Sequence, residues 1–153
     1  MISLAAVTKK FLVVDAWVLG KASTNSVDDS VFKAADVLAR ILYVCHRVVL
    51  DLATPNSETI LDEYKRQAKS DLTKRWLIAI QTRPDKVVYR DKANVTLPVL
   101  SDPDDLKYFQ VALNSPNKLI ISEDGDLASI ANDPQVVSRG IVIWSLDAAL
   151  SNL

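Results

Sequence analysis

The sequence predicts a Rossmann-like, three-layer α/β/α domain with a mostly parallel central sheet of about five strands. Strand-like and helix-like segments alternate along the chain, which is typical of parallel strands joined by crossover helices. The apolar run that opens at Phe11 indicates a strand buried on both faces. No internal repeat or linker divides residues 1–153, so we expect a single domain.

Apolar spacing and helix-start signals predict the elements of the first half. Apolar residues recur every three or four positions from Ser30 to Cys45, which indicates an amphipathic helix. Thr54 and Pro55 supply an N-cap and a first-turn proline for the helix that carries Glu63. The elements expected here are a strand opening at residue 11 and ending at 15, a helix over 30–45, a strand over 47–52, a helix after residue 55 and a helix over about 71–81.

The second half contains a conspicuous acidic stretch, SDPDDLKYF, at residues 101–109. Asp102 suits an N-cap, Pro103 suits the first helical position, and the next two aspartates favour the positive end of the helix dipole. These acids therefore have a structural explanation as a helix start. The other elements expected are strands over 87–89, 118–122 and 140–145 and a short closing helix from residue 146, whereas residues 90–100 are ambiguous.

The composition is that of a soluble globular protein, with 49% hydrophobic and 24% charged residues. The single cysteine, Cys45, excludes an intramolecular disulfide, and its apolar neighbours predict a core position. No stretch approaches the roughly 20 apolar residues that cross a bilayer, so we expect no membrane partner. The N-terminal positive charge follows an apolar run, the reverse of a signal peptide, so we expect a cytoplasmic protein.

The net charge of −1 is unevenly distributed. Residues 65–92 hold half of the lysines and arginines and only three acids, while the rest of the chain is correspondingly acidic. A basic stripe beside an acidic pocket could attract a phosphate backbone. The alternative for any one lysine in this stripe is a solvated helix face.

Several carboxylates are expected at one edge of the sheet, because ligands of open parallel sheets bind beyond the carboxyl ends of the strands. Asp15 ends the first strand and interrupts an apolar run, so it should be hydrogen-bonded, near solvent or bound to a cation. Its alternative role is to cap the turn that follows. Asp124 and Asp126 follow the fourth strand, and Asp104 and Asp105 begin the helix that leads into it. If the first and fourth strands are neighbours, these acids converge.

Carboxylates without histidine or cysteine partners suit a hard divalent ion such as Mg²⁺ or Mn²⁺. Such ions activate water and polarise phosphoryl oxygens, which is the chemistry of phosphodiester hydrolysis. The only histidine, His46, is more consistent with a structural role. With three glycines and no G-x-S-x-G sequence, the chain has neither a phosphate-cradling loop nor a hydrolase nucleophile elbow.

Four segments, in order, carry a resemblance to a known family: VVDAWVL, SETILDEYKRQA, SDPDDLKYFQVAL and LIISEDGDLASI. From about residue 11 to its end, the chain resembles a PIN domain, the nuclease fold of toxin–antitoxin toxins and of RNA-processing factors. The resemblance assigns the four principal, catalytic acids to Asp15, Glu63, Asp105 and Asp124. It makes Ser122 the hydroxyl that helps to position Asp124, and it makes Asp102, Asp104 and Asp126 neighbouring acids.

The resemblance implies a metal-dependent endoribonuclease that leaves a 5′-phosphate and a 3′-hydroxyl. Asp15, Asp105 and Asp124 would ligate Mg²⁺ or Mn²⁺, and Glu63 would hold a metal-bound water or a second ion. The implied partners are RNA, an antitoxin protein that occludes the site, and a second copy in a homodimer. Positions that follow Glu63 on its helix are candidates for phosphate contacts: Lys65, Arg66 and Lys69.

One departure from the family pattern leaves an alternative open. Trp17 stands where the family usually has an asparagine that fixes the geometry around the first acid. The alternative is therefore a catalytically weak or inactive PIN-like module that binds RNA or a protein partner. A haloacid-dehalogenase-type phosphatase fits poorly, because that class needs a second aspartate where Trp17 stands, and a receiver domain lacks its acidic pair.

Overall fold

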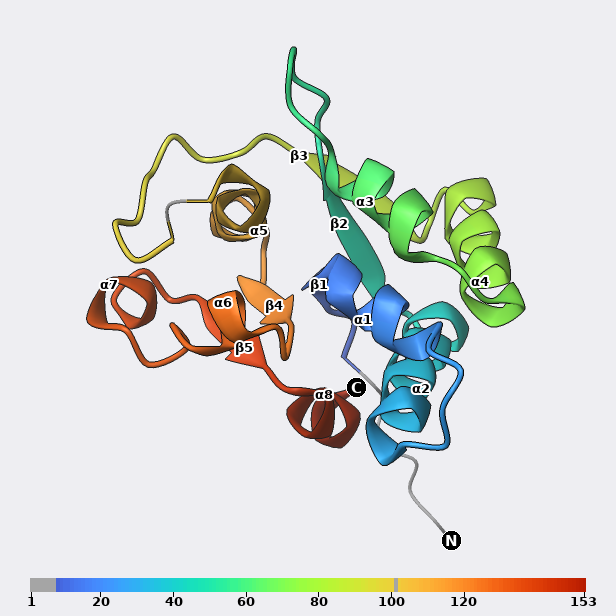
Figure 1. Cartoon of the computed structure of the whole chain (residues 1–153). Helices are drawn as coiled ribbons and strands as arrows, with labels where there is room; N and C mark the ends of the chain where they lie inside the picture. The colour runs from blue at the N-terminus through green and yellow to red at the C-terminus, as the bar shows by residue number, and fades with distance from the viewer. Residues whose placement is uncertain (1–7, 101) are drawn as a thin grey trace, which may run out of the picture.

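The computed structural model describes residues 8–100 and 102–153, and its strands form one all-parallel sheet (Figure 1). The strand order is β3-β2-β1-β4-β5, so the order reverses between β1 and β4. The expected parallel α/β sheet of five strands is thereby confirmed. The strands are β1 (Phe11–Val14), β2 (Arg47–Asp51), β3 (Val87–Arg90), β4 (Leu119–Ile121) and β5 (Val142–Trp144).

Helices cover both faces of the sheet and complete the three layers (Figure 1). One group contains α1 (Ala16–Ala22), α2 (Asp29–Tyr43), α3 (Ile60–Gln67), α4 (Asp71–Thr82) and α8 (Leu146–Asn152), and in it α2 packs against α1, α4 and α8. The other group contains α5 (Pro103–Leu113), α6 (Gly125–Ala128) and α7 (Pro134–Val137), of which α5 packs against β1, β2 and β4. β1 is therefore covered from both sides.

The core is centred on the strands that the sequence marks as apolar on both faces. Leu12, Val13 and Val14 of β1 have no exposed surface, and Val48 and Val49 of β2 are equally buried. A strand with helices on both faces has no solvent side, which explains a continuous apolar run in place of alternation. No helix within residues 8–100 or 102–153 has the length and hydropathy that a bilayer crossing needs.

The starts of α5 and α3 show which local signals determine where a helix begins. Asp102 caps α5 as expected, because its Oδ1 accepts a hydrogen bond from the Asp104 amide at 2.9 Å. The predicted cap at Thr54 is wrong, since α3 begins at Ile60 behind Thr59. Thr59 and Asp62 form a reciprocal capping box that satisfies two amide donors at this later point.

Other boundaries differ from the expectation for similar local reasons. The apolar run after Asp15 is the helix α1, because the Asp15 side chain caps it. The helix predicted to reach Cys45 ends at Tyr43, so Cys45 lies exposed in the turn before β2 and its predicted core position is wrong. The one-turn helices α6 and α7 had no periodic signal. Residues 1–7, on which the cytoplasmic expectation depended, lie outside the described residues.

Tyr64 ties α3 to the end of β1 and provides a test of this packing. Its buried hydroxyl donates to the carbonyl oxygen of Val14. In Tyr64→Phe that carbonyl loses a buried partner, so we expect the free energy of unfolding in urea to fall by about 1–3 kcal/mol. Tyr89→Phe, at a half-exposed position on β3, is the matched control and should change it by less than about 0.5 kcal/mol. Equal losses in both variants would contradict the assigned contact.

Candidate metal centre

The carboxyl ends of β1 and β4 meet at the point where the strand order reverses. The pairing of Val14 with Ile121 continues one residue further, because the Asp15 amide donates to the Ile121 carbonyl at 3.0 Å. A cavity of about 220 Å³ opens at this edge. Its lining includes all four expected principal acids and comprises Asp15, Ala16, Trp17, Glu63, Arg66, Gln67, Asp105, Tyr108 and Asp124.

A larger hollow of about 490 Å³ lies between α2 and α4, remote from these acids. Its lining is mainly alanine, leucine and aromatic side chains, with Arg75 as its one charged residue. It has no group that would ligate a cation or act on a substrate. The smaller cavity at the strand ends is therefore the candidate site.

Asp15 is held in one orientation by its neighbours. Its Oδ1 accepts a hydrogen bond from the Trp17 amide at 3.1 Å, and its Oδ2 accepts one from the Ser122 hydroxyl at 2.7 Å. The Ser122 Oγ in turn accepts a hydrogen bond from the Asp124 amide at 3.1 Å. Ser122 therefore connects the ends of β1 and β4, and its role spans Asp15 as well as the expected Asp124.

Burial makes the ionised form of Asp15 costly. The side chain is nearly inaccessible, and this loss of hydration raises the pKa of Asp15 to about 6, against the opposing hydrogen bonds from Ser122 and Trp17. The negative charges of Asp124 and Glu63 raise the same pKa further. A cation bound beside Asp15 would offset this cost at neutral pH.

One group of carboxylates at the cavity combines α5 with the start of α6, where Asp124 is the N-cap and Asp126 lies in the first turn. Oxygens of Asp105, Asp124 and Asp126 all lie within 4.8 Å of one another. Partial burial raises the pKa of Asp105 to about 7, and the adjacent Asp126 carboxylate contributes to the same rise. Three converging carboxylate oxygens form a site that a hard divalent ion would fit.

Each oxygen of Glu63, the second expected acid, already accepts a hydrogen bond from the protein. Its Oε1 accepts from the Lys107 ammonium at 2.8 Å, and its Oε2 accepts from the Tyr108 hydroxyl. The Tyr108 oxygen also accepts a hydrogen bond from the Ala16 amide at 3.2 Å, which links α3, α5 and the start of α1. The carboxylate of Glu63 therefore faces the cavity while protein donors occupy its oxygens.

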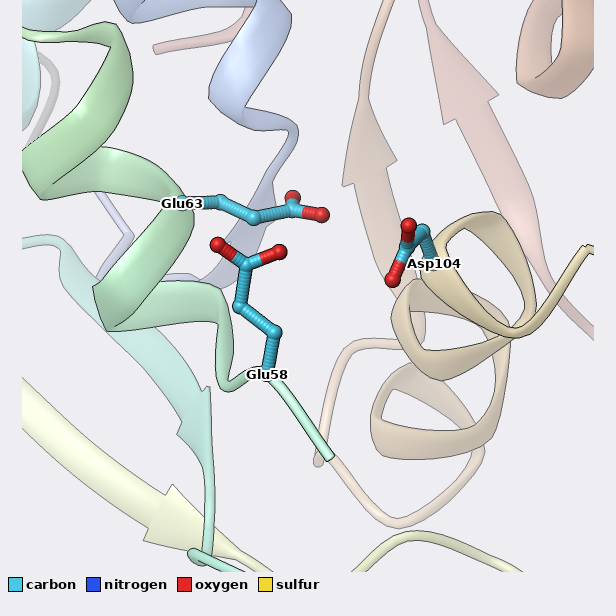
Figure 2. Close-up of side chains that lie close together, drawn as sticks. All are labelled: Glu58, Glu63 and Asp104. Carbon is cyan, nitrogen blue, oxygen red and sulfur yellow. The ribbon is translucent and has the colours of Figure 1, made fainter. Parts of the chain in front are cut away.

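A second group of acids surrounds the same lysine. Figure 2 shows Glu63 on α3, Glu58 just before it and Asp104 on α5, with their carboxylates turned toward the space between the two helices. Oxygens of these three side chains also lie within 4.8 Å of one another. The Glu58 carboxylate pairs with Arg66 at 2.8 Å, Glu63 pairs with Lys107 at 2.8 Å, and Asp104 is 3.9 Å from the same lysine, so each of the three negative charges has a positive partner.

The remaining predicted residues divide between the cavity and the surface. Asp102 caps α5 and is exposed, which agrees with its structural explanation. Arg66 lines the cavity but is paired with Glu58. Lys65 and Lys69 are exposed on and just after α3 and do not line the cavity. Only one of the three expected phosphate-binding residues therefore reaches the cavity wall.

Comparisons of the chain with protein-family models, with curated proteins and with solved structures give no match. The likeness to PIN domains thus stays at the level of the four sequence motifs. The geometry of the cavity is what carries the functional argument.

Sequence reasoning did not identify Lys107 and Glu58 as members of the site. A signal for Lys107 was present, since it lies four residues before Val111 and so shares the buried face of α5. A charged residue on such a face needs a buried partner, which would have pointed to an acid. Glu58 has no comparable signal, because it precedes its helix.

The raised pKa of Asp15 predicts how stability depends on pH in the metal-free protein. Since the pKa of Asp15 is about 6 in the fold and that of an ordinary aspartate is 3.8, ionisation between pH 4 and pH 7 destabilises the fold. Asp15→Asn removes this cost. We therefore expect its unfolding free energy, relative to wild type, to rise by about 2 kcal/mol between pH 4 and pH 7.5 in EDTA.

Urea denaturation at both pH values measures this difference. Asp36→Asn, at an exposed position on α2, is the control and should show no such pH-dependent gain. A relative stability of Asp15→Asn that does not change with pH would contradict the assigned cost of ionising Asp15.

Proposed function

We propose that the protein is a metal-dependent endoribonuclease that hydrolyses RNA phosphodiester bonds, of the kind found as the toxin of a toxin–antitoxin pair. The observation that carries the proposal is the convergence of Asp105, Asp124 and Asp126 within 4.8 Å, beside a cavity that Asp15 also lines. Carboxylate oxygens without histidine or cysteine favour Mg²⁺ or Mn²⁺. RNA, an antitoxin and a second copy of the chain are the partners that this proposal includes.

The residues at the cavity have distinct roles in this proposal. Asp105 and Asp124, with Asp15 across the cavity, would hold the divalent ion, which when bound would supply activation of water and polarisation of the scissile phosphate. Ser122 and the Trp17 amide fix the rotamer of Asp15. Lys107 and Tyr108 fix Glu63 in the cavity wall, so Glu63 positions its surroundings without ligating an ion.

The substrate class is supported by charge on the helix beside the cavity. Lys65 and Lys69 present exposed ammonium groups near Arg66, whose guanidinium lines the cavity. Positive charge next to an acidic, metal-binding cavity suits a phosphodiester backbone that must approach the ion. Water adds to the phosphorus and the bond to the 3′-oxygen breaks, which leaves a 5′-phosphate and a 3′-hydroxyl.

A catalytically inactive PIN-like module is the second candidate, and Trp17 favours it. The indole lies half-buried in the cavity wall beside Asp15, at the position where the family pattern has an asparagine. The indole can donate one hydrogen bond through Nε1 but has no acceptor, so it cannot replace the donor and acceptor of an amide side chain. In this alternative the cavity binds RNA or a protein partner without hydrolysis.

Substitution of Asp105 tests the proposed activity. Asp105→Asn removes one negative ligand from the group of carboxylates at the cavity, so we expect Mn²⁺-dependent cleavage of single-stranded RNA to fall by about 100-fold or more. Asp36→Asn is the matched control and should retain wild-type activity. Cleavage that survives in Asp105→Asn would defeat the site assignment. Purified wild-type protein that binds several RNAs and cleaves none would favour the inactive module.

The α3 side chains are tested by RNA binding in the Asp105→Asn background. Replacing Lys65, Arg66 and Lys69 with glutamine should weaken binding similarly for all sequences and reduce the salt dependence by about one unit of slope per phosphate contact. Fluorescence anisotropy between low and moderate salt measures both quantities. Lys33→Gln, on α2, should leave the slope unchanged. A slope unchanged in the triple variant would place the RNA elsewhere.

A further inference from the structure

The second acidic group, formed by Glu58, Glu63 and Asp104, has the geometry of another cation site beside the first (Figure 2). Phosphodiester-cleaving centres often use two divalent ions about 3.5–4 Å apart, one for each oxygen of the displacement. The presence of two neighbouring acidic groups therefore raises the question of how many ions the centre takes.

A lysine ammonium already lies within the second group. The Nζ of Lys107 is 2.8 Å from Glu63 Oε1, 3.1 Å from the Glu58 carbonyl oxygen and 3.9 Å from Asp104 Oδ1. Lys107 is 2% exposed, so this ammonium has given up its hydration and depends on these oxygens. It belongs to the fold and does not exchange with solvent ions.

The carboxylates that would ligate a second ion already have hydrogen-bond or ion-pair partners in the protein. Glu63 accepts hydrogen bonds at both oxygens, from Lys107 and from the Tyr108 hydroxyl. Glu58 pairs with Arg66, which leaves only Asp104, with a side chain 62% exposed, held by nothing closer than the lysine at 3.9 Å. A divalent ion would have to displace a buried ammonium and break these bonds together.

Lys107 is not placed to bind a phosphate itself. Its two hydrogen-bond acceptors and its third neighbour, Asp104, all belong to the protein, and the ammonium is buried between α3 and α5. Its effect on an ion or substrate in the adjacent cavity is therefore electrostatic and positional. Because it holds Glu63, it also fixes one wall of that cavity.

We propose that the centre takes one divalent cation, beside Asp105, Asp124 and Asp126, and that the Lys107 ammonium permanently occupies the place of a second cation among Glu58, Glu63 and Asp104. The first half of this statement rests on the function proposed above, and the second half does not. Lys107 is then a positioning residue that supplies fixed positive charge where related chemistry uses a mobile ion. The dependence of activity on metal concentration should accordingly follow single-site binding.

Counting bound Mn²⁺ tests the proposal without measuring activity. Electron paramagnetic resonance of free Mn²⁺ in titrations of the full chain should give one bound ion for wild type and two for Lys107→Met, whose neutral side chain vacates the second group. The double variant Lys107→Met/Glu63→Gln should return to one ion, because it removes the charged ligand as well. Lys107→Gln, which can still donate a hydrogen bond to Glu63, is the second single variant if the methionine variant does not fold.

The other buried lysine provides the matched control. The Nζ of Lys86 donates to backbone carbonyls of Ile41, Val44 and His46 and has no carboxylate among these partners. Lys86→Met therefore also removes a buried ammonium, but it should bind the same number of ions as wild type. A gain of an ion in this variant would show that loosened packing alone creates a site, which would overturn the assignment to Lys107.

Each pattern of ion counts has a definite meaning. Two ions on wild type, or one ion on both wild type and the folded Lys107 variants, would overturn the role of Lys107. No ion on wild type but one on Lys107→Met would defeat the proposed metal-dependent function and support the role of Lys107 as a built-in cation. No ion on any variant would overturn both.

Discussion

The parallel pairing of β1 with β4 is the constraint on which the candidate site depends. These strands are far apart in the chain, and their pairing brings Asp15 and the turn after Ile121 to the same edge of the sheet. The helices that connect β1 to β2 and β2 to β3 lie on one face of the sheet, whereas α5, which connects β3 to β4, lies on the other face. Helices α1 and α3 therefore approach the edge from one face and α5 from the other (Figure 1). Acids from four separate segments can therefore meet at one edge of the sheet.

The sequence predicted the fold, and it predicted that acids from separate segments meet at one edge of the sheet, because apolar runs and strand ends leave periodic or positional signals. The apolar runs of β1 and β4 exist because helices bury both faces, and an aspartate directly after such a run marks the strand end. The predicted start of α3 is wrong because Thr54, followed by Pro55, and Thr59 can both cap a helix. The capping box that Thr59 forms with Asp62 makes Thr59 the observed cap. Helix α1 was missed because an apolar run too short to show its period can be a strand or a helix.

The partners of the acids could not be predicted in the same way. Glu63 and Lys107 are 44 positions apart and meet only because α3 and α5 face each other across the strand ends. No pattern within either helix specifies the other. The same holds for Asp15 and Ser122, which are 107 positions apart and join at a hydrogen bond of 2.7 Å. Residue types and strand ends identified the acids, whereas the charge state of the site depends on contacts that only the tertiary fold creates.

Trp17 has a consequence of a different kind. Its indole is part of the cavity wall, its amide donates to Asp15, and the other two tryptophans of the chain, Trp76 and Trp144, do not line this cavity. The position that departs from the family pattern is thus a fluorophore at the mouth of the acidic centre. Filling of the site should change the emission of Trp17, on top of the emission of Trp76 and Trp144, so the molecule carries an optical probe of its own site without any added label.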